Sequence, residues 1–390
     1  MKKVLFCLQT MVLGGVETEL ITILSRFDKT EYDITLLLLY EQDKSVIEKI
    51  PEGVKIVNLG INRRYYCSGL LGLVKERLRR FELGSALGLC AKKMFSSSPT
   101  GANVNIDKIP TLEGEWDVAV CYHIHSPIMM RYVADKVKAK RKIGWVHNDF
   151  STTHYDIAKY ESWLNKYDAF AAVSERLCKE LIERCPSLRD KAEVVHNIVD
   201  ERLILERSKK TEELDERFAG GEGVKLLTVG RFVEQKGFDI AVEAAKILKE
   251  RELNFTWYVI GYGAEEENIR ALVEKYNLGD RFIILGRRDN PYIYMAGCDL
   301  YVQPSRHEGY PITLCEALAL DKTVLCTDFA GARELIESED DGVVVGSFEP
   351  SDIAEEIEKY ILSPERLKRG APDGEGRRSQ ADWERIKALF

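Results

Sequence analysis

The sequence predicts an α/β protein with two similar domains, each built on a parallel sheet. Short apolar runs of strand length alternate with longer segments of helical period almost from end to end, a pattern typical of parallel strands covered by helices. With 390 residues, the chain is longer than one hydrophobic core usually supports. The alternation also restarts after a charged stretch between Asp200 and Gly223. Together these observations indicate two domains of the same architecture.

The apolar runs give the expected strands. In the first half they are Lys3–Leu8, Tyr32–Leu39, Lys55–Leu59, Trp116–Val120, Lys142–His147, Ala169–Val173 and Glu193–His196. In the second half they are Lys225–Gly230, Phe255–Ile260, Phe282–Leu285, Leu300–Gln303, Val324–Thr327 and Gly342–Val345. Segments of helical period separate most of them.

The charged stretch also suggests where the domains divide. We place the hinge at its start, so that the first domain covers residues 1–199 and the second covers 200–379. After an aperiodic segment, residues 380–390 resume a helical pattern. Its apolar face consists of Trp383, Ile386 and Leu389. We expect this last helix to pack on a domain that is already folded.

Composition limits the class of protein. The net charge of −8 argues against nucleic acid as a partner, and 45% apolar with 31% charged residues is ordinary for a soluble globular protein. No apolar run approaches the roughly 20 residues needed to span a bilayer, and Met1-Lys2-Lys3 with the following apolar run fits a first strand better than a signal peptide. The nine cysteines include no Cys-x-x-Cys pair, which fits a reducing cytoplasm.

The segment from Pro304 to Ala319 carries the clearest chemical signal. It follows the strand Leu300–Gln303, and Pro311 suits the first turn of a helix because its missing N–H would have no partner there. The free N–H groups at a helix start, together with the helix dipole, favour a phosphate. In an open parallel sheet, ligands bind at this carboxyl edge. The segment therefore predicts an anion site.

Two glutamates flank that expected site. Glu308 falls in the loop and Glu316 more than one turn into the helix. Carboxylates accept charge-assisted hydrogen bonds from vicinal hydroxyls, so a ribose and a hexose on either side of a diphosphate would satisfy both. The alternative is that Glu316 is a solvated helix residue and Glu308 a loop charge.

Two cations follow another strand. Arg231 comes directly after the strand Lys225–Gly230, and Lys236 precedes the next helix. Arg231 offers a planar fork for phosphate and Lys236 a mobile point charge, a pairing that suits a departing diphosphate. Solvated surface cations are the alternative. Gly14-Gly15 after the first strand and Gly261-Tyr262-Gly263 would let the backbone approach a ligand, although such turns are common.

The histidines have two interpretations, as metal ligands and as hydrogen-bonding groups. His123 and His125 with His147 lack a helical His-x-x-x-His pair and an adjacent carboxylate cluster, so a metal site is not favoured. The sequence also contains no Asp-x-Asp, the short signature for a divalent ion held against a diphosphate. We therefore expect no metal and no cofactor. His147 ends a strand, where a neutral imidazole would hydrogen-bond a sugar hydroxyl or assist charge stabilisation; a purely structural role is the alternative.

The combination of these motifs resembles the family-4 retaining glycosyltransferases of the GT-B fold, the group 1 glycosyltransferases of bacterial polysaccharide synthesis. Glu308 and Glu316 match that family's Glu-x7-Glu motif, and Gly230-Arg231 with Lys236-Gly237 looks like its Gly-Arg…Lys-Gly segment. Gly14-Gly15 is similar to its first glycine loop. The segment His196-Asn197-Ile198-Val199-Asp200 is similar to its Pro-Asn-Gly-Val-Asp turn.

The resemblance implies a fold and roles. It implies two Rossmann-like domains facing a central cleft, with the C-terminal helix crossing back to complete the first domain. Glu308 would bind the donor sugar, Glu316 the ribose, Arg231 and Lys236 the diphosphate, and His147 would face the reacting centre. The remaining implied donor contacts are Gly14, Gly15, Gly286, Arg287, Gly309, Tyr310 and Pro311. Such enzymes retain anomeric configuration by same-face departure and attack, which needs no protein nucleophile.

The sequence departs from the family pattern at two turns. Asp321-Lys322-Thr323 stands where the family often has Gly-x-Pro, and His196 and Ile198 replace the usual Pro and Gly. These changes concern turn geometry rather than the implied ligands.

A basic segment bears on the acceptor. Residues 61–100 contain eight Lys or Arg against two acidic residues, and an amphipathic helix is expected within Tyr66–Ser96. This surface would rest on anionic lipid headgroups if the acceptor were lipid-linked, while an ordinary packing helix is the alternative.

The function that follows is transfer of a hexose from a nucleoside diphosphate sugar, with UDP expected from family frequency, to a glycan or polyprenol-linked acceptor. We expect a cytoplasmic enzyme, which a lipid-linked acceptor would place at the inner face of the cell membrane. A nucleotide-sugar epimerase or phosphorylase on the same fold is the alternative. A dinucleotide oxidoreductase lacks its full Gly-x-Gly-x-x-Gly fingerprint here, and the cations and glutamates argue against a non-catalytic glycan-binding protein.

Overall fold

The computed structural model describes residues 1–390 except 13, 41–46, 62–105, 107–108, 151–155 and 368–376. The chain divides into two compact units. The first unit comprises Met1–Ala172, Leu177–Val194 and Ala388–Phe390, and the second comprises Val173–Arg176 and Val195–Lys387. The expected amphipathic helix within Tyr66–Ser96 lies outside the described residues, as does nearly all of the basic segment.

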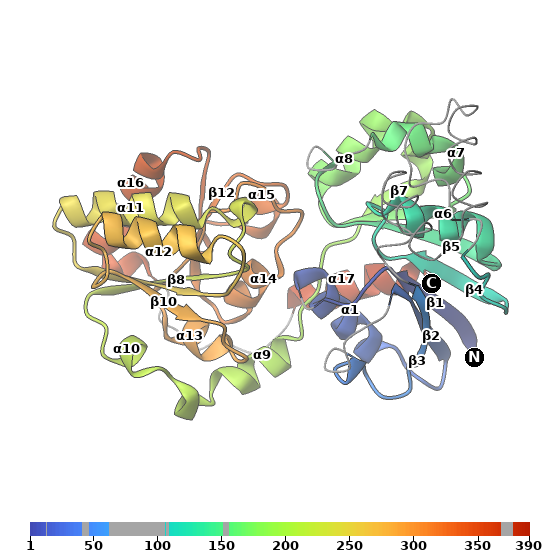
Figure 1. Ribbon diagram of the computed structural model, residues 1–390, viewed down its shortest axis with the longest axis horizontal. Helices are drawn as coiled ribbons and strands as arrows, with labels where there is room; N and C mark the ends of the chain where they lie inside the picture. The colour runs from blue at the N-terminus through green and yellow to red at the C-terminus, as the bar shows by residue number, and fades with distance from the viewer. Residues whose placement is uncertain (13, 41–46, 62–105, 107–108, 151–155, 368–376) are drawn as a thin grey trace, which may run out of the picture. The chain divides into compact units, whose positions relative to one another are not determined.

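The first unit contains a parallel sheet of seven strands within the described residues, in the order β3-β2-β1-β4-β5-β6-β7. The strands are β1 (Lys2–Leu8), β2 (Tyr32–Tyr40), β3 (Lys55–Ile61), β4 (Trp116–Cys121), β5 (Ala139–Val146), β6 (Ala169–Ala172) and β7 (Ala192–Val194). Its helices among the described residues are α1 (Gly15–Arg26), α6 (Pro127–Lys136), α7 (Glu161–Leu164) and α8 (Glu175–Arg184). Figure 1 shows α1 and α6 on opposite faces of this sheet. Central strands are buried on both faces, which explains their continuous apolar runs.

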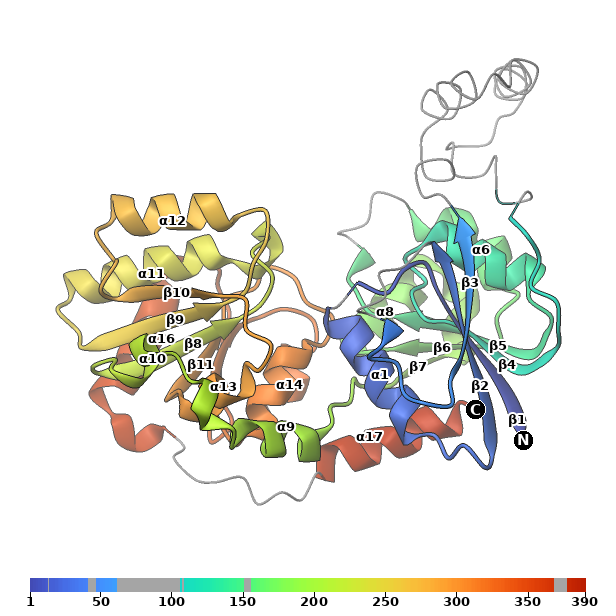
Figure 2. The ribbon, with the colours of Figure 1, turned by 60° about the horizontal axis from the view of Figure 1, so that its bottom comes forward.

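The described part of the second unit contains a parallel sheet of six strands, in the order β10-β9-β8-β11-β12-β13. The strands are β8 (Val224–Val229), β9 (Phe255–Ile260), β10 (Phe282–Gly286), β11 (Leu300–Gln303), β12 (Thr323–Thr327) and β13 (Gly342–Val345). The helices are α9 (Glu201–Ser208), α10 (Glu216–Ala219), α11 (Phe238–Glu250), α12 (Glu266–Lys275), α13 (Tyr292–Gly297), α14 (Ile312–Ala319), α15 (Ala332–Leu335), α16 (Pro350–Leu362) and α17 (Arg377–Ala388). Figures 1 and 2 show α11 and α12 on one face of the sheet and α9 and α13 on the other.

The winding of each sheet determines where a ligand is expected. In both sheets the strand order reverses beside the first strand, between β1 and β4 in the first unit and between β8 and β11 in the second. Loops that leave the carboxyl ends of two such strands turn to opposite faces, and the crevice between them is where doubly wound sheets bind ligands. The second unit has the strand order of a Rossmann fold.

The predicted fold class is confirmed: the chain is α/β, with two Rossmann-like parallel sheets. A strand is present in the structure at each of the predicted positions, with ends that differ by a few residues at most. The last helix, α17, begins earlier than residue 380, at Arg377. Its predicted apolar face of Trp383, Ile386 and Leu389 is buried. In the described part of the chain, no helix is long and apolar enough to cross a membrane.

Candidate functional site

The loops after β8 and β11 meet at the switch point of the second unit. Gly237 has a φ of +67°, and a Cβ there would lie 2.0 Å from the carbonyl oxygen of Pro304, so only glycine allows this approach. The amide of Arg306 donates to the carbonyl of Gln235 at 2.8 Å, and the Gln235 amide donates to the carbonyl of His307 at 2.7 Å. These contacts place Lys236 beside Glu308.

Lys236 and Glu308 form an ion pair. The Lys236 ammonium lies 2.5 Å from Glu308 Oε1, and both side chains are largely buried. The same oxygen accepts from Ser305 Oγ at 2.8 Å and from Gln303 Nε2 at 3.1 Å. Among the described residues, no donor contacts Glu308 Oε2. The carboxylate is therefore fixed through one oxygen and has the other available for a ligand hydroxyl.

Gln303 and Ser305 orient Glu308, and sequence reasoning assigned neither of them that role. Gln303 is buried in the last position of β11, where it accepts from the hydroxyls of Tyr301 at 3.0 Å and Thr313 at 3.2 Å. These two contacts fix the orientation of the side-chain amide, so its NH₂ group faces Ser305 and Glu308 and donates to both. A buried amide at the end of an apolar strand was the available signal.

Glu316 lies in α14 and is buried to 6% exposure. Its Oε1 accepts from the hydroxyl of Tyr292 on α13 at 2.9 Å, and no described residue donates to Oε2. Burial raises the pKa of Glu316 to about 7, although the Tyr292 hydrogen bond and nearby Arg207 act in the opposite direction. Glu316 is thus not the solvated helix residue of the alternative interpretation. A ligand that donates to it would hold it ionised.

The loop before α14 is buried and leads into a helix start without a side-chain cap. Pro311 was expected in the first helical turn, but it is the N-cap, with an extended ψ of 123°, and the helix begins at Ile312. Pro311 has no side-chain oxygen with which to cap the helix, so the first N–H groups receive no side-chain cap. Tyr310 is buried, and its carbonyl accepts from Asn197 Nδ2 at 2.6 Å. Gly309, Tyr310 and Pro311 therefore form a fixed loop between the two glutamates.

The other residues predicted in the second unit lie at the ends of β8 and β10. Arg231 follows β8, and its side chain is exposed without an ion pair to any described residue. Gly286 ends β10 with a φ of +75°. Arg287 is exposed, and its guanidinium lies 5.5 Å from the centre of the Tyr262 ring. The structure therefore brings Lys236 and Glu308 into contact, while Arg231 is exposed and Arg287 lies over Tyr262 and pairs with Asp289.

The predicted residues of the first unit also lie at carboxyl ends of strands. Gly14 is the N-cap of α1 and Gly15 its first residue, and the φ of −153° at Gly14 is extended backbone that any residue adopts. A Cβ on Gly14 would lie 3.1 Å from Glu17 Oε2, the end of a flexible side chain that can move aside, so neither backbone nor space requires glycine here. His147 directly follows β5 and is buried.

His147 belongs to a buried polar cluster. The hydroxyl of Tyr122 donates to Glu19 Oε2 at 2.8 Å, and the same oxygen lies 3.7 Å from His147 Nδ1. Neither ring nitrogen of His147 makes a hydrogen bond to a described residue. Burial and the neighbouring His123 and His125 hold the pKa of His147 well below its ordinary value, so the imidazole is neutral at pH 7.

Glu19 and Tyr122 were not identified from the sequence. Glu19 lies four residues before Ile23, on the face of α1 that the sheet covers, and a glutamate on an apolar face was the signal. In the part of the chain that the structure describes, no group of three His, Cys, Asp or Glu side chains is placed to hold a metal ion.

Comparison with known proteins assigns a family to the region around Lys236, Glu308 and Glu316. Residues 209–375 match the family model described as glycosyl transferases group 1. The predicted resemblance to the group 1 glycosyltransferases is confirmed. One curated relative in that group is an N-acetylgalactosaminyltransferase of Campylobacter jejuni, named for an N-acetylgalactosamine-N,N'-diacetylbacillosaminyl-diphospho-undecaprenol substrate. It is 29% identical over 181 residues, which cover 46% of this chain and 47% of that protein. The chain spans about half the length of the curated relatives that it matches.

Solved structures share the fold over the whole chain. HepE of Anabaena, solved in complex with UDP, superimposes with a TM-score of 0.69 at 18% identity, covering 100% of this chain and 99% of that one. A glycosyltransferase of Rickettsia africae gives a TM-score of 0.65 at 16% identity, covering 100% and 94%. At these identities the likeness establishes the fold alone, which is the predicted GT-B class.

Proposed function

We propose that this chain is a glycosyltransferase that moves a hexose from a nucleoside diphosphate sugar to a hydroxyl group of a glycan or lipid-linked oligosaccharide. The observation that carries the proposal is the pair of buried glutamates at the switch point of the second unit. Each is held through one carboxylate oxygen and has no described donor on the other. Two such acceptors, with a cation and a helix start beside them, suit two hydroxyl-bearing groups joined by a diphosphate.

Glu316 and Glu308 bind different parts of the nucleoside diphosphate sugar. Glu316 accepts from the ribose hydroxyls and Glu308 from the hexose hydroxyls. Lys236, Arg231 and the uncapped N–H groups of α14 bind the diphosphate. Lys236 neutralises Glu308 at a distance of 2.5 Å. A bound diphosphate attracts the Lys236 ammonium toward its own oxygens, so the Glu308 carboxylate is less neutralised and accepts hydrogen bonds from hydroxyl groups more strongly. The UDP bound in the HepE structures supports UDP as the nucleotide.

The chemistry needs charge stabilisation more than a protein nucleophile. When the bond between the anomeric carbon and the diphosphate oxygen breaks, negative charge grows on the leaving phosphate, and Lys236 and Arg231 supply fixed positive charge for it. We propose retention by departure and attack on the same face, with the leaving phosphate taking the acceptor proton. These cations would serve without a metal ion. Because His147 is neutral, we propose that it hydrogen-bonds a hydroxyl group and does not stabilise a developing charge.

The acceptor side of the proposal rests on the relatives. The Campylobacter jejuni relative is named for a diphospho-undecaprenol substrate, which supports a lipid-linked acceptor in polysaccharide synthesis. We therefore propose that the enzyme works in the cytoplasm at the inner face of the membrane, held there by residues 61–100. Changing Lys75, Arg79 and Arg80 to Glu is expected to reduce co-sedimentation with anionic liposomes several-fold. Unchanged co-sedimentation would refute the membrane contact.

The experiment that tests the function is a screen against nucleotide sugars. The full chain is incubated with each sugar and a lipid-linked or glycan acceptor, and both thermal stabilisation and released nucleotide are measured. We expect one sugar to stabilise the protein and to release its nucleoside diphosphate in step with a glycosylated acceptor. The Glu308→Ala variant should lose turnover and keep most of its UDP affinity. An isomerised sugar instead of a glycosylated acceptor would indicate the epimerase, and activity of Glu308→Ala at the wild-type level would overturn the mechanism.

A further inference from the structure

His196 stands where the resembling family usually has proline, and the proposed catalytic roles leave it unused. It follows β7 and belongs to the second unit. Its side chain is 18% exposed, so most of the imidazole is removed from water. A buried and potentially charged ring at a position where proline would serve indicates a purpose other than shaping the turn.

Two carboxylates hold the ring through both of its nitrogens. Nε2 lies 2.9 Å from Glu334 Oε2 on α15, and Nδ1 lies 3.4 Å from Asp382 Oδ1 on α17. Glu334 is itself held in place, because both of its oxygens accept from the backbone N–H of Glu175 at 3.0 Å. Nε2 is within hydrogen-bond distance of Glu334 and Nδ1 faces a second carboxylate, so the doubly protonated imidazolium, with an N–H on each nitrogen, suits both partners.

The face of the imidazolium rests on Tyr310. The two ring centres are 4.7 Å apart and the planes differ by 10°, a stacked arrangement in which a cation lies over an aromatic ring. Gly331 packs closely against the same residue: a Cβ at position 331 would lie 2.8 Å from Tyr310 Cδ2 and 2.7 Å from the carbonyl oxygen of Gly309. Asn197, the next residue after His196, binds the Tyr310 carbonyl at 2.6 Å.

The charges around the ring favour its cationic form. In the described residues, the titratable groups that face it are Glu334 from α15, Asp382 from α17 and the phenol of Tyr310. Arg385 lies 3.6 Å from the same Asp382 oxygen that faces the ring. Burial lowers the pKa of His196, but the hydrogen bonds to Asp382 and Glu334 outweigh it and raise the pKa to about 9.

We propose that His196 is a positioning residue for donor binding: clamped by Glu334 and Asp382, its imidazolium stacks on Tyr310 and fixes the loop of Gly309–Pro311 against the diphosphate. This inference rests on the proposed function, because it assigns a purpose to His196 only if that loop binds the donor. It adds a second group of residues, outside the site, on which donor affinity depends. The clamp acts on the binding of the nucleotide, so it changes the dissociation constant and KM more than kcat.

Two variants of the full chain separate the charge from the ring. His196→Arg keeps a planar cation that can stack on Tyr310 and reach both carboxylates, and it does not titrate below pH 12. His196→Phe keeps the aromatic stack but leaves Glu334 and Asp382 without their cation. The dissociation constant of UDP is measured by calorimetry between pH 7 and 10, and NMR follows the His196 ring proton, assigned by its absence from the His196→Arg spectrum.

For the wild type we expect the UDP dissociation constant to rise about tenfold as the pH passes through 9, because the imidazolium loses its charge. His196→Arg should bind like the wild type at pH 7 and change less than about twofold relative to that value by pH 10. His196→Phe should bind about tenfold more weakly at pH 7, without the additional step near pH 9. Because His196→Arg retains every other titrating group, it isolates the contribution of His196.

The outcomes distinguish this inference from the function on which it rests. If the wild type binds no nucleotide, the proposed function fails. If the wild type binds UDP and His196→Arg shows the same loss above pH 9, another group titrates and the inference is wrong. A His196→Phe protein that melts earlier but binds UDP normally would show a structural role only and would also refute it. Should His196→Phe fail to fold, the comparison of the wild type with His196→Arg still decides.

Discussion

Replacing Glu316 with Gln should strengthen the fold and weaken the ligand site at the same time. The pKa of Glu316 rises from 4.5 to about 7 on folding, chiefly through burial. Because the folded-state value is higher, the protonated carboxyl contributes stability that is fully present below pH 4.5 and is lost as the pH rises through 7. At pH 8 the wild type must ionise a carboxylate that is 6% exposed, which costs about 3 kcal/mol. At pH 5 the cost is below about 1 kcal/mol.

Glutamine stays neutral and can still accept from Tyr292, so Glu316→Gln avoids that cost. In a domain of this size, about 3 kcal/mol corresponds to a gain in Tm of about 6 °C or more at pH 8, falling to about 2 °C at pH 5. UDP affinity should fall about tenfold at pH 8, because a neutral acceptor replaces a charged one opposite the ribose. Wild-type affinity should itself decline as the pH falls below 7, since protonation disables the acceptor.

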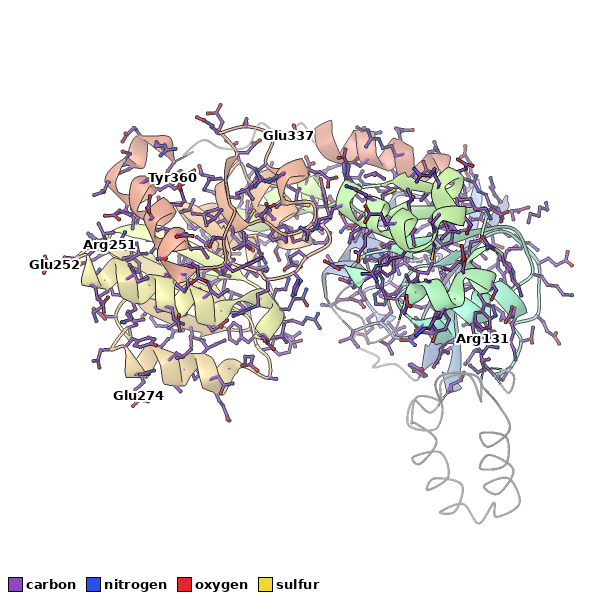
Figure 3. All side chains as sticks on the ribbon, turned by 90° about the horizontal axis from the view of Figure 1, so that it is seen from above. Arg131, Arg251, Glu252, Glu274, Glu337 and Tyr360 are labelled. Carbon is purple, nitrogen blue, oxygen red and sulfur yellow. The ribbon has the colours of Figure 1, made fainter. Side chains whose placement is uncertain are left out.

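The assay is a pair of thermal melts, at pH 5 and pH 8, with UDP titrations under the same conditions. Glu274→Gln is the matched control, because Glu274 is exposed on the outer side of α12 (Figure 3). It should leave both Tm and affinity unchanged. The reasoning is refuted if Glu316→Gln melts with the wild type at both pH values, or if it gains stability at pH 8 without losing UDP affinity.

Three further substitutions test other contacts. Gly331→Ala should lower the free energy of unfolding by about 1–2 kcal/mol and weaken UDP binding, because its φ is +77° and its Cβ would strike the donor loop. Gly346→Ala, with open space around it, is the control in urea unfolding, and equal losses in both would contradict the steric argument. Tyr122→Phe removes the 2.8 Å donor of a buried carboxylate and should cost about 1–3 kcal/mol; unchanged urea unfolding would argue against that hydrogen bond. Lys236→Met should raise the UDP dissociation constant about tenfold and reduce its salt dependence, whereas an unchanged salt dependence would remove Lys236 from the diphosphate site.

The fold was largely predictable because buried parallel strands appear in the sequence as continuous apolar runs. A strand buried on both faces must be apolar throughout, so runs such as Phe255–Ile260 and Leu300–Gln303 have the same bounds in the sequence prediction and in the structure. Helix starts were less certain, since Pro311 suits both an N-cap and a first helical turn. The turn after α14 shows how a departure is accommodated. Asp321 adopts a φ of +53°, which aspartate tolerates better than most residues with a side chain.

The candidate site was predictable only where chemistry coincides with a motif. Glu308, Glu316 and Lys236 were found because charged residues at the carboxyl ends of strands are conspicuous. Gln303 and Tyr292, which orient those carboxylates, contact them through packing that no sequence spacing encodes. The same holds for the His196 clamp, whose acids come from helices more than 130 residues away along the chain.

The electrostatics of the two switch points argue for different ligands at each. In the second unit, the charges of Glu308 and Lys236 balance each other beside the uncapped N–H groups of α14. An anion that binds there accepts hydrogen bonds from these N–H groups, and the free oxygen of Glu308 can still accept from a hydroxyl group. In the first unit, burial keeps His147 and His123 neutral by lowering their pKa values, and the buried carboxylate of Glu19 accepts a hydrogen bond from the phenol of Tyr122. Neutral imidazoles suit hydroxyl groups better than phosphates, so under the proposed function this cluster would hydrogen-bond a hydroxyl group.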